Sequence, residues 1–381
     1  MKKLYLIIVL FLTAFSSIKA QETIIDSIFS GGIYRNYRIY IPIAYSDDTP
    51  APLLFNLHGY TSDAFGQSLY ANFNNIADTA GFITVIPNGT IDVYGNRYWN
   101  CFVAPGTGVN DVAFLSDLID SLNLAYNIDL NRVYSTGMSN GGFMSHALAC
   151  ELSNRIAAIA SVTGSIDEDR IAYCDPMHTT PVMQIHGTAD ATVPYDGDFG
   201  FMPVDSVVAY WVNQNNCFGE PAFTAVPNIV TTDLCTAEHY VYSSCNNDIN
   251  IELFKIIGGG HTWPGTALTF LGVTNLDINA CREIWRFLSQ YRLDELTGVE
   301  TNPLIKNDIN VYPNPFTENT FINSANALIS SWTLYDHQGK LVAADYSVTN
   351  NLITISGKNL LAGMYCLIVN NTAALQLVKL D

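Results

Sequence analysis

The sequence predicts an α/β fold, in which helices cover both faces of a mostly parallel sheet, followed by a small β module. Short, nearly continuous apolar runs at residues 52–57 and 81–87 are typical of strands buried on both faces. Segments with apolar residues three or four apart, as at 111–126, alternate with such runs and predict amphipathic helices. After residue 293 the chain becomes polar and then changes to short strand-like runs.

The elements of the large domain follow one another as strand and helix. Expected strands lie at residues 37–41, 52–57, 81–87, 156–162, 181–186 and 251–257, with a further strand ending at Gly137. Expected helices lie at 111–126, after Gly141, near 204–212 and at 277–291. The C-terminal module has expected strands at 332–335, 352–355 and 364–369, as in a small β-sandwich. In a parallel sheet, catalytic groups gather at the carboxyl ends of the strands.

Composition limits the classes of function. With 381 residues the chain can form one large domain and a small one. Only 14% of the residues are charged and 49% are hydrophobic, which excludes a disordered chain. The formal net charge of −18 would repel a phosphate backbone, so we expect no nucleic-acid partner. A neutral or polymeric substrate fits this acidic protein better.

The first twenty residues have the pattern of an export signal. Lys2 and Lys3 precede an apolar run, too short to span a bilayer, that ends in small residues at Ala20. We therefore expect a protein that is exported through the periplasm and is secreted or held at the cell surface. The expected divisions are a signal peptide at 1–20, an α/β catalytic domain at 21–293, a linker at 294–310 and a C-terminal module at 311–381.

A candidate nucleophile lies in the stretch Gly137-Met138-Ser139-Asn140-Gly141, which connects an apolar strand to a helix-prone segment. This is the G-x-S-x-G elbow of the α/β-hydrolase fold, which holds a serine on a sharp strand-to-helix turn. Side chains at the flanking glycines would clash with the strained backbone of the serine. The free N–H groups of the following helix favour developing negative charge.

Elimination among the seven histidines leaves His261 as the general base. It follows the last buried strand, on a loop whose glycines let the backbone reach the serine. His58 and His186 precede glycines at strand ends, where they fit structural roles in turns better. The other histidines occupy less suitable segments of the chain: His146, His178, His239 and His337.

The acid of the triad is expected on the loop after the strand that ends at His186, because the order in this fold is serine, acid, histidine. Asp190 is the first acid on that loop, and Asp196 and Asp198 are rivals close behind it. We predict Asp190, which orients the base and stabilises its charged form.

An oxyanion hole needs two backbone N–H groups that point at the developing alkoxide. We expect one from Asn140, the residue after the nucleophile, and one from Tyr60, on the loop after residues 52–57. The Tyr60 ring is also a candidate to flank the acyl group. Tyr98 and Trp99, together with Trp263, are candidates for flat apolar walls, so Tyr60, Trp99 and Trp263 are the predicted substrate contacts.

Eight cysteines in an exported protein predict disulfide bonds. Seven lie in the large domain and one, Cys366, in the C-terminal module, so the large domain keeps an unpaired thiol or a bridge to elsewhere. No Cys-x-x-Cys pair is present, which argues against zinc. We expect neither a metal nor a cofactor.

With these residues placed, the large domain resembles the secreted esterases grouped with polyhydroxybutyrate depolymerases and feruloyl esterases. The resemblance covers roughly residues 25–293, with the motifs in the family's order. The motifs are Leu57-His58-Gly59, Asp111-Val112-Ala113-Phe114-Leu115, Gly137-Met138-Ser139-Asn140-Gly141-Gly142, His186-Gly187-Thr188-Ala189-Asp190 with Val193-Pro194-Tyr195, and His261-Thr262-Trp263-Pro264-Gly265.

The resemblance implies an esterase of the α/β-hydrolase fold. It implies Ser139 as nucleophile, Asp190 as acid and His261 as base, in agreement with the elimination above. It also implies two disulfide bonds in the large domain, Cys150–Cys174 and Cys217–Cys245. Three cysteines of this domain have no assigned partner: Cys101, Cys235 and Cys281.

The C-terminal module resembles the sorting domain of the Por (type IX) secretion system. The resemblance rests on Val311-Tyr312-Pro313-Asn314-Pro315, Leu334-Tyr335-Asp336 through Gly339, Leu361-Ala362-Gly363-Met364-Tyr365, and Lys379. It implies the outer-membrane secretion machinery as a partner, with the module either cleaved after export or left as an anchor.

Together these observations favour a secreted serine esterase that forms an acyl-enzyme, acting on a polymer. Polyhydroxyalkanoate, feruloylated or acetylated plant polysaccharide, and other polyesters all fit as substrates. Two alternatives are a catalytically silent hydrolase fold that binds polysaccharide at the cell surface, and a serine peptidase. The complete set of Ser139, Asp190 and His261 argues against the first, and the lack of a segment for a lid or propeller domain argues against the second.

Overall fold

The computed structural model describes residues 21–102, 108–267, 271–296, 309–324, 329, 331–336, 340–349, 352–369 and 373–380. Contacts divide the chain between Leu296 and Thr297 into two compact units, called here the large unit and the C-terminal unit. The signal peptide predicted at 1–20 lies outside the described residues. No helix among the described residues is long and apolar enough to cross a membrane.

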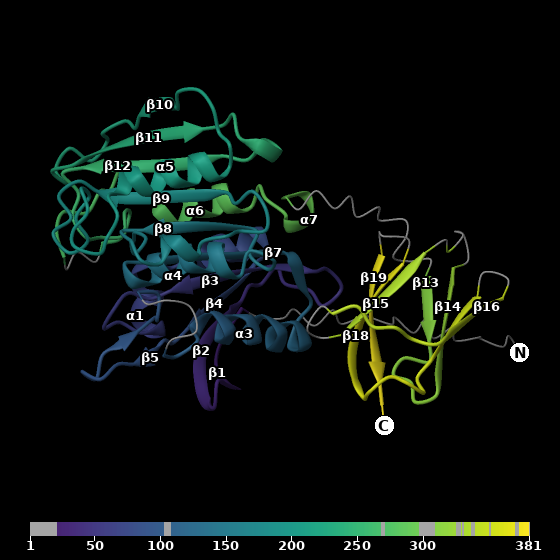
Figure 1. Ribbon diagram of the computed structural model, residues 1–381. Helices are drawn as coiled ribbons and strands as arrows, with labels where there is room; N and C mark the ends of the chain where they lie inside the picture. Colours follow the sequence, from purple (N-terminus) through teal and green to yellow (C-terminus); the bar gives the residue numbers. More distant parts are fainter. Residues whose placement is uncertain are drawn as a thin grey trace, which may run out of the picture. The chain divides into compact units, whose positions relative to one another are not determined.

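The large unit is built around a ten-stranded sheet (Figure 1). In spatial order the strands are β1 (Glu22–Ser30), β2 (Ile33–Ile41), β4 (Ile83–Pro87), β3 (Ala51–Leu57), β7 (Ile128–Met138), β8 (Ala158–Val162), β9 (Val182–Gly187), β12 (Ile251–Ile257), β11 (Thr236–Tyr242) and β10 (Ala222–Ala225). The six strands from β4 to β12 pair in parallel, and antiparallel strands extend the sheet at both ends. The predicted α/β fold is confirmed.

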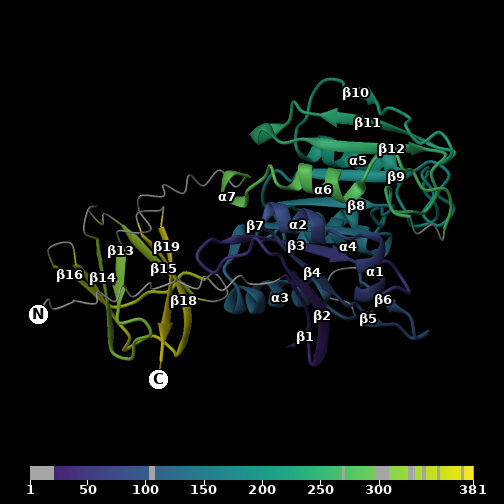
Figure 2. The same ribbon diagram turned by 180° about the vertical axis from the view of Figure 1, so that it is seen from behind.

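Helices cover both faces of this sheet, which explains the apolar runs of its central strands. The helices are α1 (Ala64–Tyr70), α2 (Asn74–Ala80), α3 (Asp111–Ala125), α4 (Asn140–Glu151), α5 (Val204–Gln214), α6 (Ala280–Leu288) and α7 (Leu293–Leu296). Figures 1 and 2 show α3, α4 and α5 over one face and α2 and α6 over the other. Every residue of β3, β4, β8 and β9 is consequently buried.

Several short elements were not expected from the sequence. The strand expected at 37–41 is the second half of β2, which forms a hairpin with β1 at the edge of the sheet. Helices α1 and α2 have seven residues each, too few for a clear apolar period. The hairpin of β5 (Thr90–Ile91) and β6 (Arg97–Tyr98) has only two residues in each strand.

The linker predicted at 294–310 differs from the structure at both ends. Its first residues form helix α7, in which Leu293 and Leu296 are buried in the large unit. Its last two residues belong to strand β13 (Ile309–Tyr312). The residues between these leucines are acidic, so the sequence showed a polar segment and no helix was predicted. Residues 297–308 lie outside the described part of the chain.

The C-terminal unit consists of two small antiparallel sheets, as the sequence predicts. One sheet has the order β13, β14 (Asn319–Ser324), β17 (Leu352–Ser356), β16 (Tyr346–Thr349), and the other has the order β15 (Trp332–Asp336), β18 (Gly363–Val369), β19 (Ala373–Lys379). Side chains from both sheets form one apolar core, which includes Ile322, Ile355, Leu367 and Leu377. This unit therefore has a hydrophobic core of its own.

Candidate active site

Ser139 lies at the sharp turn between β7 and α4, as the elbow motif predicts. Its backbone angles are φ 55° and ψ −122°, a conformation that is strained for a residue with a side chain. A Cβ on Gly137 would lie 2.5 Å from the backbone of Gly141, and a Cβ on Gly141 would lie 2.2 Å from the Leu57 carbonyl oxygen. The two glycines are therefore required for the turn that presents the serine.

His261 and Asp190 form a buried pair beside this turn. His261 follows β12, and Asp190 lies on the loop after β9. The His261 Nδ1 is 2.8 Å from the Asp190 Oδ2, and the two residues are only 3% and 5% exposed. Since a carboxylate can only accept, Nδ1 carries a proton, and in the neutral ring Nε2 then keeps a free lone pair. A neutral His261 in this form can accept a proton from a serine hydroxyl.

The Asp190 carboxylate is held in its ionised form by four donors. Burial alone would raise its pKa, but hydrogen bonds from His186 and His261 and from the backbone of its own loop lower that pKa below the usual range. Oδ1 accepts from the N–H groups of Thr192 and Val193 at 2.8 and 2.9 Å. The rival acids Asp196 and Asp198 are exposed at the surface.

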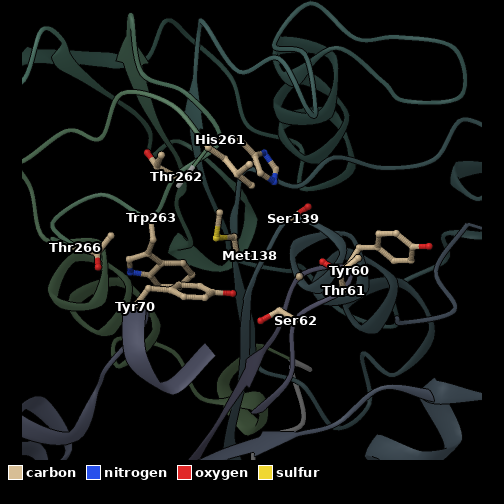
Figure 3. A pocket seen from close by; sticks show the side chains of 12 residues that line it. Tyr60, Thr61, Ser62, Tyr70, Met138, Ser139, His261, Thr262, Trp263 and Thr266 are labelled. Atoms are coloured by element: carbon tan, nitrogen blue, oxygen red, sulfur yellow. The ribbon is translucent and has the colours of Figure 1, made fainter. Parts of the chain in front are cut away.

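Ser139 and His261 line one pocket, which has a volume of about 180 Å³ (Figure 3). Its other walls combine aromatic and aliphatic side chains with hydroxyl groups, contributed by Tyr70, Met138, Trp263, Leu271, Thr61, Ser62, Thr262 and Thr266. Figure 3 shows the rings of Tyr70 and Trp263 side by side, with their centroids 6.5 Å apart. The pocket can thus accept a group that has both apolar and polar parts.

The two backbone N–H groups predicted to form an oxyanion hole belong to Tyr60, which lines this pocket, and to Asn140, which follows Ser139. Within the described part of the chain, neither the Tyr60 N–H nor the Asn140 N–H donates to any acceptor. Asn140 begins helix α4, so its N–H is free by position. The next N–H on the other loop, that of Thr61, is already bound to the Arg97 carbonyl at 2.9 Å.

His58 fixes the orientation of the peptide between Gly59 and Tyr60. Its Nδ1 donates to the Gly59 carbonyl at 2.8 Å, and its Nε2 accepts the Gly89 N–H at 2.9 Å. Because the C=O and N–H of a trans peptide point in opposite directions, this contact aims the Tyr60 N–H away from His58. Burial lowers the pKa of His58 to about 4, so the ring is neutral at pH 7.

The three predicted substrate contacts differ in where they lie relative to the pocket. Trp263 is a wall of the pocket. Tyr60 lies at its rim with its ring turned away from Ser139 (Figure 3), because its hydroxyl donates to Asp92 at 2.7 Å. The prediction for Trp99 is wrong: this side chain is fully buried, and its Nε1 donates to the His58 carbonyl at 2.9 Å.

Several residues that line or support the pocket were not predicted from the sequence. Tyr70 belongs to α1, a helix without a sequence signal, and Ser62, Thr266 and Leu271 lie on loops whose course is set by tertiary packing. His186 was assigned a role in a turn, but its Nε2 lies 3.4 Å from the Asp190 Oδ2. The His186-to-Asp190 spacing in the sequence motif was the one available signal for this contact.

Both disulfide bonds implied by the resemblance are present, Cys150–Cys174 and Cys217–Cys245. Of the remaining cysteines of the large unit, Cys101, Cys235 and Cys281 are free and buried. The described residues contain no group of three or more histidine, cysteine or acidic side chains arranged to hold a metal.

Each of the two units contains a stretch that matches a known protein family. Residues 35–195 match the family described as "Esterase PHB depolymerase". Residues 310–380 match the family described as "Secretion system C-terminal sorting domain". This sorting domain marks the protein for type IX secretion, to the cell surface or beyond it.

The relatives of the large unit are esterases. The chain is 28% identical over 274 residues to "Bifunctional acetylxylan esterase/xylanase XynS20E" of Neocallimastix patriciarum, which covers 72% of this chain and 36% of that protein. It is 27% identical over 239 residues to "Feruloyl esterase B" of Piromyces equi, which covers 60% of this chain and 42% of that protein. The chain thus spans less than half the length of each relative.

Among solved structures, the chain is similar to "Acetyl xylan esterase from Aspergillus awamori", with a TM-score of 0.54 and 13% identity, covering 71% of this chain and 99% of that one. This likeness shows the fold, an α/β-hydrolase fold. In sequence, residues 35–195 match the model of the esterase PHB depolymerase family, and residues 310–380 match that of the secretion system C-terminal sorting domain.

Proposed function

We propose that the protein is an exported serine esterase with Ser139, His261 and Asp190 as its catalytic triad. The observation that carries the proposal is the buried His261–Asp190 pair, 2.8 Å apart, at a pocket that Ser139 also lines. The strained turn at Ser139 supports it, because such strain is stored at functional sites.

The chemistry follows from the placement of these groups. His261 Nε2 takes the proton from the Ser139 hydroxyl as its oxygen attacks the ester carbonyl. The N–H groups of Tyr60 and Asn140 bind the resulting oxyanion. His261 then gives the proton to the departing alcohol, which leaves an ester between Ser139 and the acyl group. Water, activated by His261 in the same way, releases the acid and restores the serine.

The substrate that fits best is a polymer that carries ester bonds. Exposed apolar side chains lie on two elements connected to the pocket. Helix α1, which supplies Tyr70 to the pocket, carries Phe65 and Leu69, and the β5–β6 hairpin, which binds Tyr60, carries Ile91, Val93 and Tyr94. The turn is joined to the pocket rim because Asn96 and Asp92 both bind the Tyr60 hydroxyl, at 2.8 and 2.7 Å. A small soluble ester has no need of this apolar surface, whereas an insoluble chain can lie on it.

The names of the relatives suggest which polymers to test. One relative is named an acetylxylan esterase and another a feruloyl esterase. Polyhydroxyalkanoate is the third candidate, from the name of the matching family. The sorting domain adds a partner, the type IX secretion machinery of the outer membrane.

The test compares wild type and Ser139→Ala on polyhydroxybutyrate, methyl ferulate, acetylated xylan and p-nitrophenyl acyl esters. We expect the variant to fold normally and to lose nearly all activity, roughly 10⁶-fold in kcat, because the oxyanion hole alone contributes little. Mass spectrometry of wild type with a slow ester should show the acyl group on Ser139. Normal turnover by Ser139→Ala would contradict the proposal.

A further inference from the structure

Behind the acid of the proposed triad lies a line of four buried side chains, which we call the buried network: Trp211, His146, Gln184 and His186. They come from α5, α4 and β9, and each is 0–1% exposed. Successive members are in hydrogen-bond contact, at 3.2 Å from Trp211 Nε1 to His146 Nδ1, 3.1 Å from His146 Nε2 to Gln184 Oε1, and 3.1 Å from Gln184 Nε2 to His186 Nδ1.

The direction of every bond in the buried network is determined. An indole N–H can only donate, so His146 Nδ1 accepts and the proton of His146 is on Nε2. That proton goes to Gln184 Oε1, and the amide group of Gln184 donates both to the Gly164 carbonyl, at 2.7 Å, and to His186 Nδ1. His186 Nδ1 is therefore an acceptor, and the neutral ring carries its proton on Nε2.

That proton points at the loop of the catalytic acid. His186 Nε2 lies 2.8 Å from the Val193 carbonyl and 3.4 Å from the Asp190 Oδ2. The Val193 N–H in turn donates to the Asp190 Oδ1. His186 thus contacts the acid directly and also fixes the turn that binds the other oxygen of the same carboxylate. Asp190 Oδ2 is the atom that accepts from His261.

We propose that His186 is a positioning residue of the triad, which keeps the Asp190 carboxylate in line with His261. The rest of the buried network holds the His186 ring in the tautomer that this contact needs. In the other tautomer a lone pair on Nε2 would face the Val193 carbonyl and the carboxylate, and the contact would become repulsive. The inference rests on the proposed function, because Asp190 matters as the acid of the triad.

The first test compares His186→Leu, which removes the donor but keeps volume, with His186→Gln, which keeps an N–H near the position of Nε2. We expect His186→Leu to lower kcat about 10- to 100-fold with KM nearly unchanged, because a displaced acid misorients the base. His186→Gln should recover a large part of this loss. His239→Leu is the matched control, since it removes a histidine that binds Glu252 on the neighbouring part of the sheet.

A second test asks whether Gln184 acts through His186. Gln184→Met should lower kcat by less than His186→Leu does, and the double variant should be no slower than His186→Leu alone. Multiplied effects in the double variant would overturn the inference, as would wild-type kcat in a folded His186→Leu, or equal losses in His186→Leu and His239→Leu.

The third measurement needs no variant and no activity. Nitrogen-15 shifts of the histidine rings in the intact protein should show His186 protonated on Nε2 and not on Nδ1. The opposite tautomer would overturn the inference. If the wild type instead hydrolyses no ester while His186 shows the expected tautomer, the proposed function has failed and the buried network stands as a structural feature only.

Discussion

The proposed role of Asp190 depends on the residues that contact its carboxylate more than on its own position in the sequence. Asp190, Asp196 and Asp198 share one loop, but only Asp190 is buried with donors to both of its oxygens. A carboxylate in this setting stays ionised and fixes the proton of His261 on Nδ1. The exposed carboxylates of Asp196 and Asp198 do not hold His261, because its Nδ1 is bound to Asp190.

This difference predicts the effect of removing each charge. Asp190→Asn should lower kcat by roughly 10³- to 10⁴-fold, because the amide cannot hold His261 in the required tautomer. Asp196→Asn, an exposed neighbour on the same loop, should leave kcat close to wild type. Steady-state kinetics on a p-nitrophenyl ester measures both. A larger loss in Asp196→Asn would reassign the acid.

Buried neutral histidines predict how stability depends on pH. Burial lowers the pKa of His58 and of His146 from 6.5 to about 4, so the unfolded chain binds more protons than the folded one as the pH falls. Their contribution is complete above pH 6.5 and is lost between pH 6.5 and 4. The lowered pKa of Asp190 acts in the same direction at lower pH.

We therefore expect the free energy of unfolding to be lower at pH 5 than at pH 7.5, by about 2 kcal/mol for each of the two histidines. Urea unfolding at the two pH values measures the difference. Replacing His58 by Asn should remove about half of it. An identical free energy at both pH values would show that these rings are charged or exposed in the folded protein.

Motifs led to the residues of the proposed triad, but they could not show which aromatic rings line the pocket. Trp99 and Trp263 both lie in loops near the expected site, and the sequence gives no measure of their burial. The buried indole of Trp99 donates to the His58 carbonyl. Trp263 instead packs against Phe73 and Tyr70 at the pocket wall. Long-range packing decides such cases, and no local pattern encodes it.

At the scale of elements, long apolar strands were predictable and short connections were not. Strands β3 and β4 were found because burial on both faces leaves continuous apolar runs. Helix α1 and the β5–β6 hairpin were missed because each is too short to show a period. Helix α1 supplies Tyr70 to the pocket, and the hairpin binds Tyr60 at its rim, so the surroundings of the pocket are the part of the site least accessible to sequence analysis.

The exposed apolar side chains of the β5–β6 hairpin predict that polymeric and soluble substrates respond differently to their removal. The double variant Val93→Ser/Tyr94→Ser changes two side chains that are 92% and 83% exposed. It should reduce hydrolysis of the preferred polymer roughly 10-fold, since burying one such side chain contributes more than 1.4 kcal/mol. Hydrolysis of p-nitrophenyl acetate should remain at the wild-type rate. Leu124→Ser, at the end of α3 and 90% exposed, is the control.

The two disulfide bonds brace segments that position the acid and the base. Cys150–Cys174 joins the end of α4 to the approach to β9, and Cys217–Cys245 joins the segment after α5 to the segment before β12. The bonds close loops with sequence separations of 24 and 28 residues. Loop entropy assigns about 3 kcal/mol of stability to each.

Cys217→Ala/Cys245→Ala should accordingly lower the free energy of unfolding by about 3 kcal/mol in a urea titration. Activity should be lost at a lower temperature than in the wild type. Non-reducing peptide mapping checks the pairing itself. Bridges from Cys150 or Cys217 to Cys101, Cys235 or Cys281 would refute this scheme.

At the scale of the whole molecule, the proposed triad and the sorting domain belong to separate compact units. A protein of residues 21–296 should therefore fold and hydrolyse p-nitrophenyl esters with the kcat of the full chain. In the native host, deleting residues 311–381 should leave active enzyme in the periplasm. Cell fractionation measures this, and secretion of the shortened protein into the medium would exclude a sorting role.

The pairing of the central strands also affects how fast the protein folds. Strand β3 pairs with β7, which places Leu53 opposite Val133, and many other pairs of the sheet join segments far apart in the chain. Closing such distant pairs costs loop entropy before any contact is gained, so topologies of this kind fold slowly. We therefore expect a newly made chain to stay unfolded long enough to be exported through the inner membrane. Slow assembly of the sheet would thus favour the export of the unfolded chain.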